Sequence, residues 1–111
     1  MNMRNADILK ILNGKCMTGR STDFKICRDK MHKFISDRRF GAFGEAYVES
    51  WFISKIGDLS AEEISMLGYS SIEEYLSEPF NKGLTKEDSK KFIIWSNFTP
   101  FWDVLDKINW Q

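Results

Sequence analysis

The sequence predicts an α+β domain with a curled, mainly antiparallel sheet and short flanking helices. Residues 45–56 and 91–98 are rich in β-branched and aromatic side chains, which is typical of strands. Two segments between them begin with Ser followed three residues later by Glu, the signature of a capped helix start. A short amphipathic segment precedes all of these elements.

That first segment, residues 5–14, is expected to form a helix of about two turns. Asn5 is placed to cap it, and Asp7 in the first turn complements the positive end of the helix dipole. Gly14 suits the left-handed position that follows a helix end. The apolar face repeats at helical spacing and consists of Ile8, Leu9, Ile11 and Leu12.

The segment that follows is the most basic part of the chain. Residues 15–22 are small and polar, which predicts a loop. Residues 24–28 alternate in polarity with a period of two, which predicts a strand. Residues 32–35 fit a strand too, whereas residues 37–44 indicate a basic loop with glycine hinges.

Residues 45–56 carry apolar groups on both faces, so we expect a central strand there. A capped helix is then expected from Ser60 to Gly68, and a second one from Ser71 to the break at Pro79. A charged loop leads to the second strong strand, which Pro100 ends. The aromatic residues expected in the core are Trp51, Trp95 and Phe98.

Length and composition favour one globular domain over residues 1–111, and 42% hydrophobic with 29% charged residues argues against disorder. No apolar run approaches the ~20 residues that span a bilayer. Cys16 and Cys27 are expected to be free thiols in a reducing compartment, so we expect a soluble, cytoplasmic protein. Since His32 is the only histidine, no metal site and no cofactor are expected.

The zero net charge hides an uneven distribution. Residues 1–41 contain ten basic and four acidic side chains, whereas residues 42–111 contain six and twelve. The first part therefore carries +6 and the second −6. Such a division can present a basic face to an anionic partner, or the two parts can neutralise each other on folding.

Four stretches of the chain resemble the ASCH domain, a branch of the PUA-like superfamily. Residues 11–20 combine a helix ending in glycine with Lys, Thr and Arg, and residues 44–56 are similar to the family's long strand. Residues 64–76 are close to its helix, Gly-aromatic and Glu-Glu signature, and residues 91–98 match its closing strand. The resemblance implies a β-barrel-like fold whose cleft binds RNA or modified nucleobases.

The resemblance also implies a possible enzyme, because some relatives are amidohydrolases that remove the acetyl group of N4-acetylcytidine with a lysine, a threonine and a glutamate. By position the lysine falls on Lys15 and the threonine on Thr18. The glutamate position is occupied by Leu67. The nearest substitutes are Glu63, Glu62 and Glu45, of which Glu63 is the assigned candidate. Without such a carboxylate, the pair binds an anion but makes a weak hydrolase.

Three functions remain open. The first is a nucleic-acid-binding module whose cleft forms at residues 15–20. Its candidate contacts are Lys15, Thr18, Arg20, Arg28, Arg38 and Arg39, although for the last two a solubilising charge is the first explanation and a phosphate contact the second. The second is the amidohydrolase. The third is a small protein-interaction module that uses the aromatic tail from Phe101 to Trp110. A membrane partner is not expected.

Overall fold

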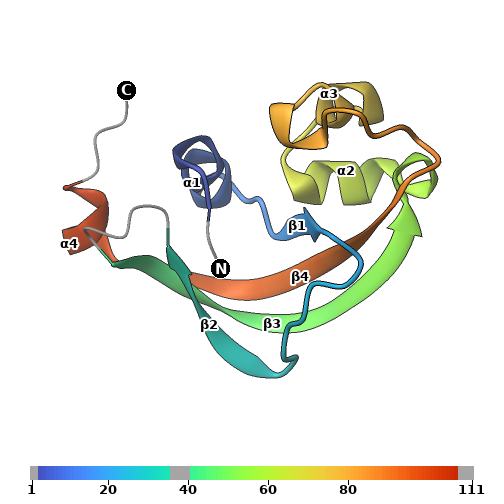
Figure 1. Ribbon diagram of the computed structural model, residues 1–111. Helices are drawn as coiled ribbons and strands as arrows, with labels where there is room; N and C mark the ends of the chain where they lie inside the picture. Colours follow the sequence, from blue (N-terminus) through green and yellow to red (C-terminus); the bar gives the residue numbers. More distant parts are fainter. Residues whose placement is uncertain (1–2, 36–40, 108–111) are drawn as a thin grey trace.

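Four antiparallel strands form one curved sheet in the order β1-β4-β3-β2 (Figure 1). The structure is a computed structural model that describes residues 3–35 and 41–107. The strands are β1 (Met17–Arg20), β2 (Lys30–Ile35), β3 (Ala42–Lys55) and β4 (Ser89–Pro100). The two long strands predicted from composition are β3 and β4, and β3 is central as expected. The predicted α+β class with a curled antiparallel sheet is confirmed.

The long β3–β4 pair gives the sheet its curl. Its register runs from Gly44 opposite Pro100 to Lys55 opposite Ser89, with two irregularities in between. Such bulges bend a strand and increase its twist. Within the described residues the sheet stays open, because β1 pairs only with β4 and β2 only with β3. The expected closure into a barrel is therefore wrong.

Short helices cover the concave side of the sheet. They are α1 (Asn5–Leu12), α2 (Ala61–Leu67) and α3 (Ile72–Leu76), all above the sheet in Figure 1. A last helix, α4 (Trp102–Leu105), follows β4, and two 3-10 turns lie at Ile56–Asp58 (η1) and Pro79–Asn81 (η2). The longest helix of the described residues, α1, has eight residues, which is too short to cross a membrane.

The helix caps follow the sequence closely, with one exception. Ser60 accepts a hydrogen bond from the Glu63 N–H while the Glu63 carboxylate accepts from the Ser60 N–H, so the predicted capping box of α2 is confirmed. Ser71 likewise caps α3. At α1 the N-cap is Arg4 without a side-chain bond, so the expected cap at Asn5 is wrong.

The core consists of two clusters on the concave side of the sheet. The first packs α1 and α4 against the sheet, and its members are Met3, Ile8, Ile11, Phe34, Phe43, Ala46, Trp95 and Leu105. The second packs α2 and α3 against the sheet, and its members are Met17, Ile56, Leu59, Ile64, Leu67, Tyr69, Tyr75 and Phe92. Trp95 and Phe98 pack in the core as expected.

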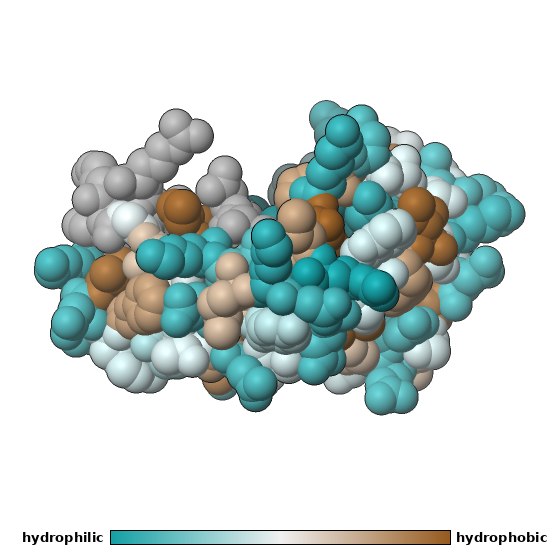
Figure 2. All heavy atoms as spheres, turned by 90° about the horizontal axis from the view of Figure 1, so that it is seen from below, coloured by the Kyte–Doolittle hydropathy of each residue, from teal (hydrophilic) through white to brown (hydrophobic). Residues whose placement is uncertain are grey.

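Three local expectations are wrong. The loop expected at residues 15–22 contains strand β1, and residues 24–28 form no strand. Trp51, expected in the core, is 41% exposed, and the Lys91 ammonium lies over its ring. Seen from below in Figure 2, the molecule shows apolar side chains in separate patches among polar ones. No large apolar face is apparent in that view.

Candidate functional site

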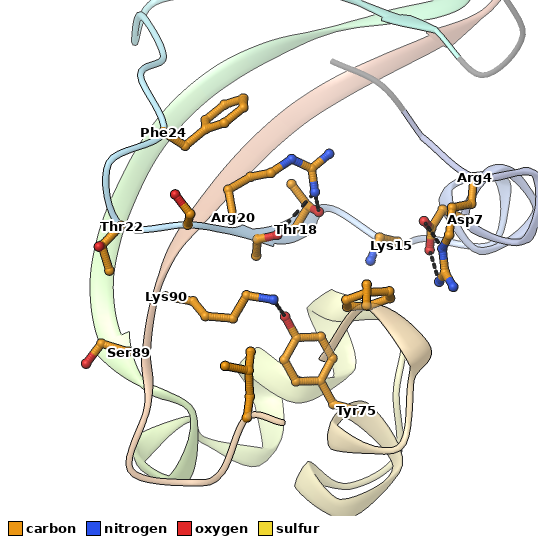
Figure 3. A pocket seen from close by; sticks show the side chains of 14 residues that line it. Arg4, Asp7, Lys15, Thr18, Arg20, Thr22, Phe24, Tyr75, Ser89 and Lys90 are labelled. Atoms are coloured by element: carbon orange, nitrogen blue, oxygen red, sulfur yellow. Dashed lines mark hydrogen bonds and ion pairs between the residues drawn. The ribbon is translucent and has the colours of Figure 1, made fainter. Parts of the chain in front are cut away.

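A cleft of about 660 Å³ lies beside strand β1, between the start of α1 and Tyr75 of α3 (Figure 3). Five segments line it: the start of α1, the chain from Lys15 through β1 to Phe24, α3, η2 with Leu84 after it, and the start of β4. Its walls carry charged and aromatic side chains that come from distant parts of the sequence. A cavity of this size accommodates a small organic ligand.

Lys15 enters the cleft directly after the end of α1. Gly14, at a φ of +111°, provides the left-handed turn, and a side chain there would be strained. Lys15 is only 7% exposed, and its Nζ donates a hydrogen bond to the Leu67 carbonyl at 2.6 Å. Burial lowers the pKa of Lys15 to about 8, although the Asp7 carboxylate opposes the shift.

Thr18 and Arg20 alternate along β1 and therefore lie on one face of the strand. The Arg20 guanidinium folds back, and its Nη1 donates to Thr18 Oγ1 at 2.9 Å and to the Gly19 carbonyl at 3.1 Å. Burial lowers the pKa of Arg20 below its usual value. The absence of a side chain at Gly19 leaves room for the Tyr75 hydroxyl, which a Cβ there would overlap.

The carboxylate of the cleft is Asp7. Nε and Nη2 of Arg4 donate to it at 3.1 and 3.2 Å, and Nη1 of Arg4 donates to Glu78 at 3.0 Å. Burial raises the pKa of the Asp7 carboxyl, but the bonds from Arg4 and the charge of Lys15 outweigh it, so the pKa lies below its usual value.

Sequence reasoning did not assign Asp7 to the site, since a carboxylate in the first turn of a helix is already explained by the dipole. One signal was available. Asp7 shares a helix face with Ile8 and Ile11, and a carboxylate on a buried face needs a partner.

A second buried lysine lies at the start of β4. Lys90 is 8% exposed, and its Nζ donates to Tyr75 Oη at 3.0 Å and to Asn81 Oδ1 at 2.8 Å. The Asn81 amide in turn donates to the Tyr75 carbonyl at 2.8 Å. Burial, followed by the charge of Arg20, lowers the pKa of Lys90 to about 8, and burial raises the pKa of Tyr75 to about 12. Lys90 precedes the strand predicted at residues 91–98 and has charged and polar neighbours, so the sequence carried no signal for this group.

The remaining candidate residues lie elsewhere. Glu63 caps the start of α2 and does not line the cleft. Arg28 is exposed in the turn before β2, and Arg38 and Arg39 fall outside the described residues. Burial and the charge of Glu49 raise the pKa of Cys16 and outweigh the lowering effect of its neighbour Lys15.

Leu67, at the position where the resemblance places a glutamate, lies beside the cleft lysine. Its carbonyl accepts the Lys15 hydrogen bond, while its side chain is fully buried in the core. The position therefore adjoins Lys15 in space, but its side chain supplies no carboxylate.

Positive charge dominates the walls of the cleft. Its described lining includes four cations and one carboxylate, namely Arg4, Lys15, Arg20, Lys90 and Asp7. Aromatic rings stand beside the cations: the Arg4 guanidinium lies 4.5 Å from the Phe80 ring centre, and that of Arg20 lies 5.7 Å from that of Phe24. The combination suits an anionic ligand with a flat ring.

Solved structures of similar fold include the ASCH protein of Zymomonas mobilis, with a TM-score of 0.66 and 15% identity over 90% of this chain and 67% of that one. Two point variants of that protein give a TM-score of 0.67 at 14% identity, over 90% of this chain and 68% and 69% of theirs. The chain therefore has an ASCH domain fold. The sequence matches no protein-family model and no curated protein.

Proposed function

We propose that the protein is a nucleic-acid-binding module of the ASCH/PUA-like type, whose cleft holds one nucleotide of RNA or a modified nucleobase. The observation that carries the proposal is the excess of cations over carboxylates in a cleft with aromatic walls. Cations bind phosphate oxygens, and aromatic rings stack on bases that are not paired in a duplex.

The arrangement of the rings supports a single-stranded ligand. Phe24 follows β1 and Phe80 belongs to η2, so the two rings come from separate segments of the wall. Both are at least partly exposed and open to contact with a base. A base stacked on either ring would place its sugar and phosphate among the cations of the cleft.

Binding of a labelled single-stranded oligoribonucleotide at 50 and 200 mM salt tests the proposal. Each phosphate contact contributes roughly −0.7 to the slope of log K against log salt, so affinity must fall steeply. Arg20→Gln removes one charged contact, and we expect affinity to fall about tenfold. Lys107→Gln, an exposed lysine that does not line the cleft, serves as the control and is expected to bind as the wild type does.

The absence of affinity for any RNA or DNA at 50 mM salt would contradict the proposal. Equal losses in the Arg20 and Lys107 variants would show that binding follows net charge rather than the cleft. The basic segment around Arg28 is tested in the same assay with Arg28→Gln.

A second candidate is the amidohydrolase, which Lys15 favours. A lysine whose pKa is near 8 is partly neutral in slightly alkaline solution and can take a proton from a hydroxyl group. Thr18 and Asp7 lie in the same cleft, so Asp7 is a nearer carboxylate than the capping residue Glu63.

Incubation with N4-acetylcytidine and measurement of cytidine and acetate tests this candidate. We expect Lys15→Ala to reduce turnover at least a hundredfold, the usual contribution of a general base. Asp7→Asn and Glu63→Gln together decide which carboxylate assists, because only the assisting one affects turnover. Unchanged turnover in Lys15→Ala would reject the assigned role.

A further inference from the structure

Among the described residues, Lys90 has no carboxylate partner, whereas Arg4 and Lys15 in the same cleft each have a carboxylate nearby. Arg4 is paired with two carboxylates, and Lys15 is near Asp7. The partners of the Lys90 ammonium among the described residues are neutral oxygens of Tyr75 and Asn81. A buried ammonium without a countercharge is unfavourable, so the cleft holds uncompensated charge at this end.

The geometry leaves Lys90 able to bind a ligand. An ammonium group has three N–H donors, and the bonds to Tyr75 and Asn81 use two of them. The two bonds fix the direction of the third donor, and Lys90 lines the cleft. Figure 3 shows the Lys90 and Arg20 side chains extending across the same part of the cleft, with the Tyr75 hydroxyl beside Lys90.

Tyr75 and Gly19 complete this end of the cleft. The Tyr75 hydroxyl accepts from Lys90 and retains its own proton as a donor. It reaches this position against β1 because Gly19 has no side chain. A guanidinium, an ammonium and a hydroxyl thus offer donors, and the only carboxylate of the described lining, Asp7, is held by Arg4.

We propose that Lys90, the Tyr75 hydroxyl and the Arg20 guanidinium form a subsite for a phosphate group of the ligand. The proposal deepens the proposed function and rests on it. A phosphate supplies several acceptor oxygens and the negative charge that Lys90 lacks. A base placed here would instead face two cations, with hydroxyl oxygens but no unpaired carboxylate of the described lining to accept from its N–H groups.

The phosphate is either the terminal monoester of a nucleotide or an internal diester of a strand. Titration calorimetry with three probes separates these sources: inorganic phosphate, a 5′-phosphorylated oligoribonucleotide, and the same oligoribonucleotide with a 5′-hydroxyl. Dependence of binding on the 5′-phosphate indicates the monoester. Equal binding of both oligonucleotides, lost together in the Lys90 variants, indicates the diester.

The test compares Lys90→Met and Lys90→Gln with Lys82→Met. The glutamine retains a donor for Asn81, which protects the fold, and circular dichroism monitors folding in each variant. Lys82 is exposed and does not line the cleft, so its loss removes the same charge without touching the subsite. We expect the Lys90 variants to bind at least tenfold more weakly, with a salt slope reduced by about 0.7, and Lys82→Met to keep both values.

Two results separate the subsite from the proposed function. If wild type binds RNA and the folded Lys90 variants keep its affinity and salt slope, the subsite is wrong and the proposed function stands. If wild type binds inorganic phosphate through Lys90 but no nucleic acid, the subsite stands and the proposed function fails.

Discussion

The two buried lysines of the cleft lower the stability of the folded protein. Both Lys15 and Lys90 have pKa values lowered to about 8, with burial as the largest cause. Keeping them charged at neutral pH therefore destabilises the folded state. A bound anion would stabilise the charged form and would therefore offset this loss of stability.

The pKa shifts predict that the protein becomes more stable as pH rises above 8. Between pH 8 and about 10 an unfolded lysine holds its proton while the folded one loses it, so the unfolded state binds more protons. The free energy of unfolding should rise on the order of 1 kcal/mol per pH unit. Urea denaturation at pH 7.0 to 9.5 measures it.

Lys15→Met with Lys90→Met is the matched variant, and its unfolding free energy should change little over this interval. Readings stop at pH 9.5 because unfolded tyrosines begin to ionise near pH 10, while the pKa of Tyr75 in the fold is about 12. That difference lowers stability above pH 10. A flat wild-type profile would mean that the two lysines keep ordinary pKa values.

At the level of residues, the sequence identified three polar residues of the cleft. Lys15, Thr18 and Arg20 were found because they are close together in the chain. Asp7 and Lys90 were missed because each has an ordinary local explanation, a helix dipole or a solvated charge. Their roles arise from partners far away in the sequence: Asp7 lies near Lys15, and Lys90 bonds Tyr75 and Asn81.

At the scale of elements, the sequence predicted the helices and strands that depend on interactions between neighbouring residues. The caps of α2 and α3 and the long strands β3 and β4 are encoded within a few residues each. Strand β1 was missed because its four residues Met17–Arg20 are mostly small or polar. Pairing with β4, from Met17 opposite Ile94 to Arg20 opposite Lys91, makes them a strand.

The strand predicted at residues 24–28 does not form, and the reason is again strand pairing. Residues 24–28 alternate in polarity, but the structure gives them no paired strand, so the pattern has no sheet to join. The Lys91 ammonium instead donates a hydrogen bond to the Phe24 carbonyl, which holds the start of this segment beside the cleft. This position allows Phe24 to contribute a ring to the wall.

At the scale of the whole molecule, the open sheet explains why a cleft exists. A closed barrel would fill its interior with side chains, whereas the curved sheet packs two separate clusters on its concave side. The cleft lies on this side beside β1 and the start of β4, and charged residues from both halves of the sequence line it. Sequence alone did not reveal this division, because the clusters depend on contacts between distant segments.

The C-terminal segment belongs to the core, because α4 contributes Leu105 to the first cluster. Leu105 is 1% exposed and packs with α1 and the sheet, whereas Trp102 on the same helix is 58% exposed. The tail was a candidate surface for a protein partner, and Trp102 remains available for that role. Trp110 falls outside the described residues.

We expect Leu105→Ala to lower the free energy of unfolding by about 2–5 kcal/mol, the usual effect of emptying a buried leucine site. Trp102→Ala should change it by no more than about 0.5 kcal/mol, because its side chain is largely exposed. Urea denaturation at pH 7 measures both. A wild-type midpoint for Leu105→Ala would show that α4 is not part of the core and would leave the helix as a surface for a partner.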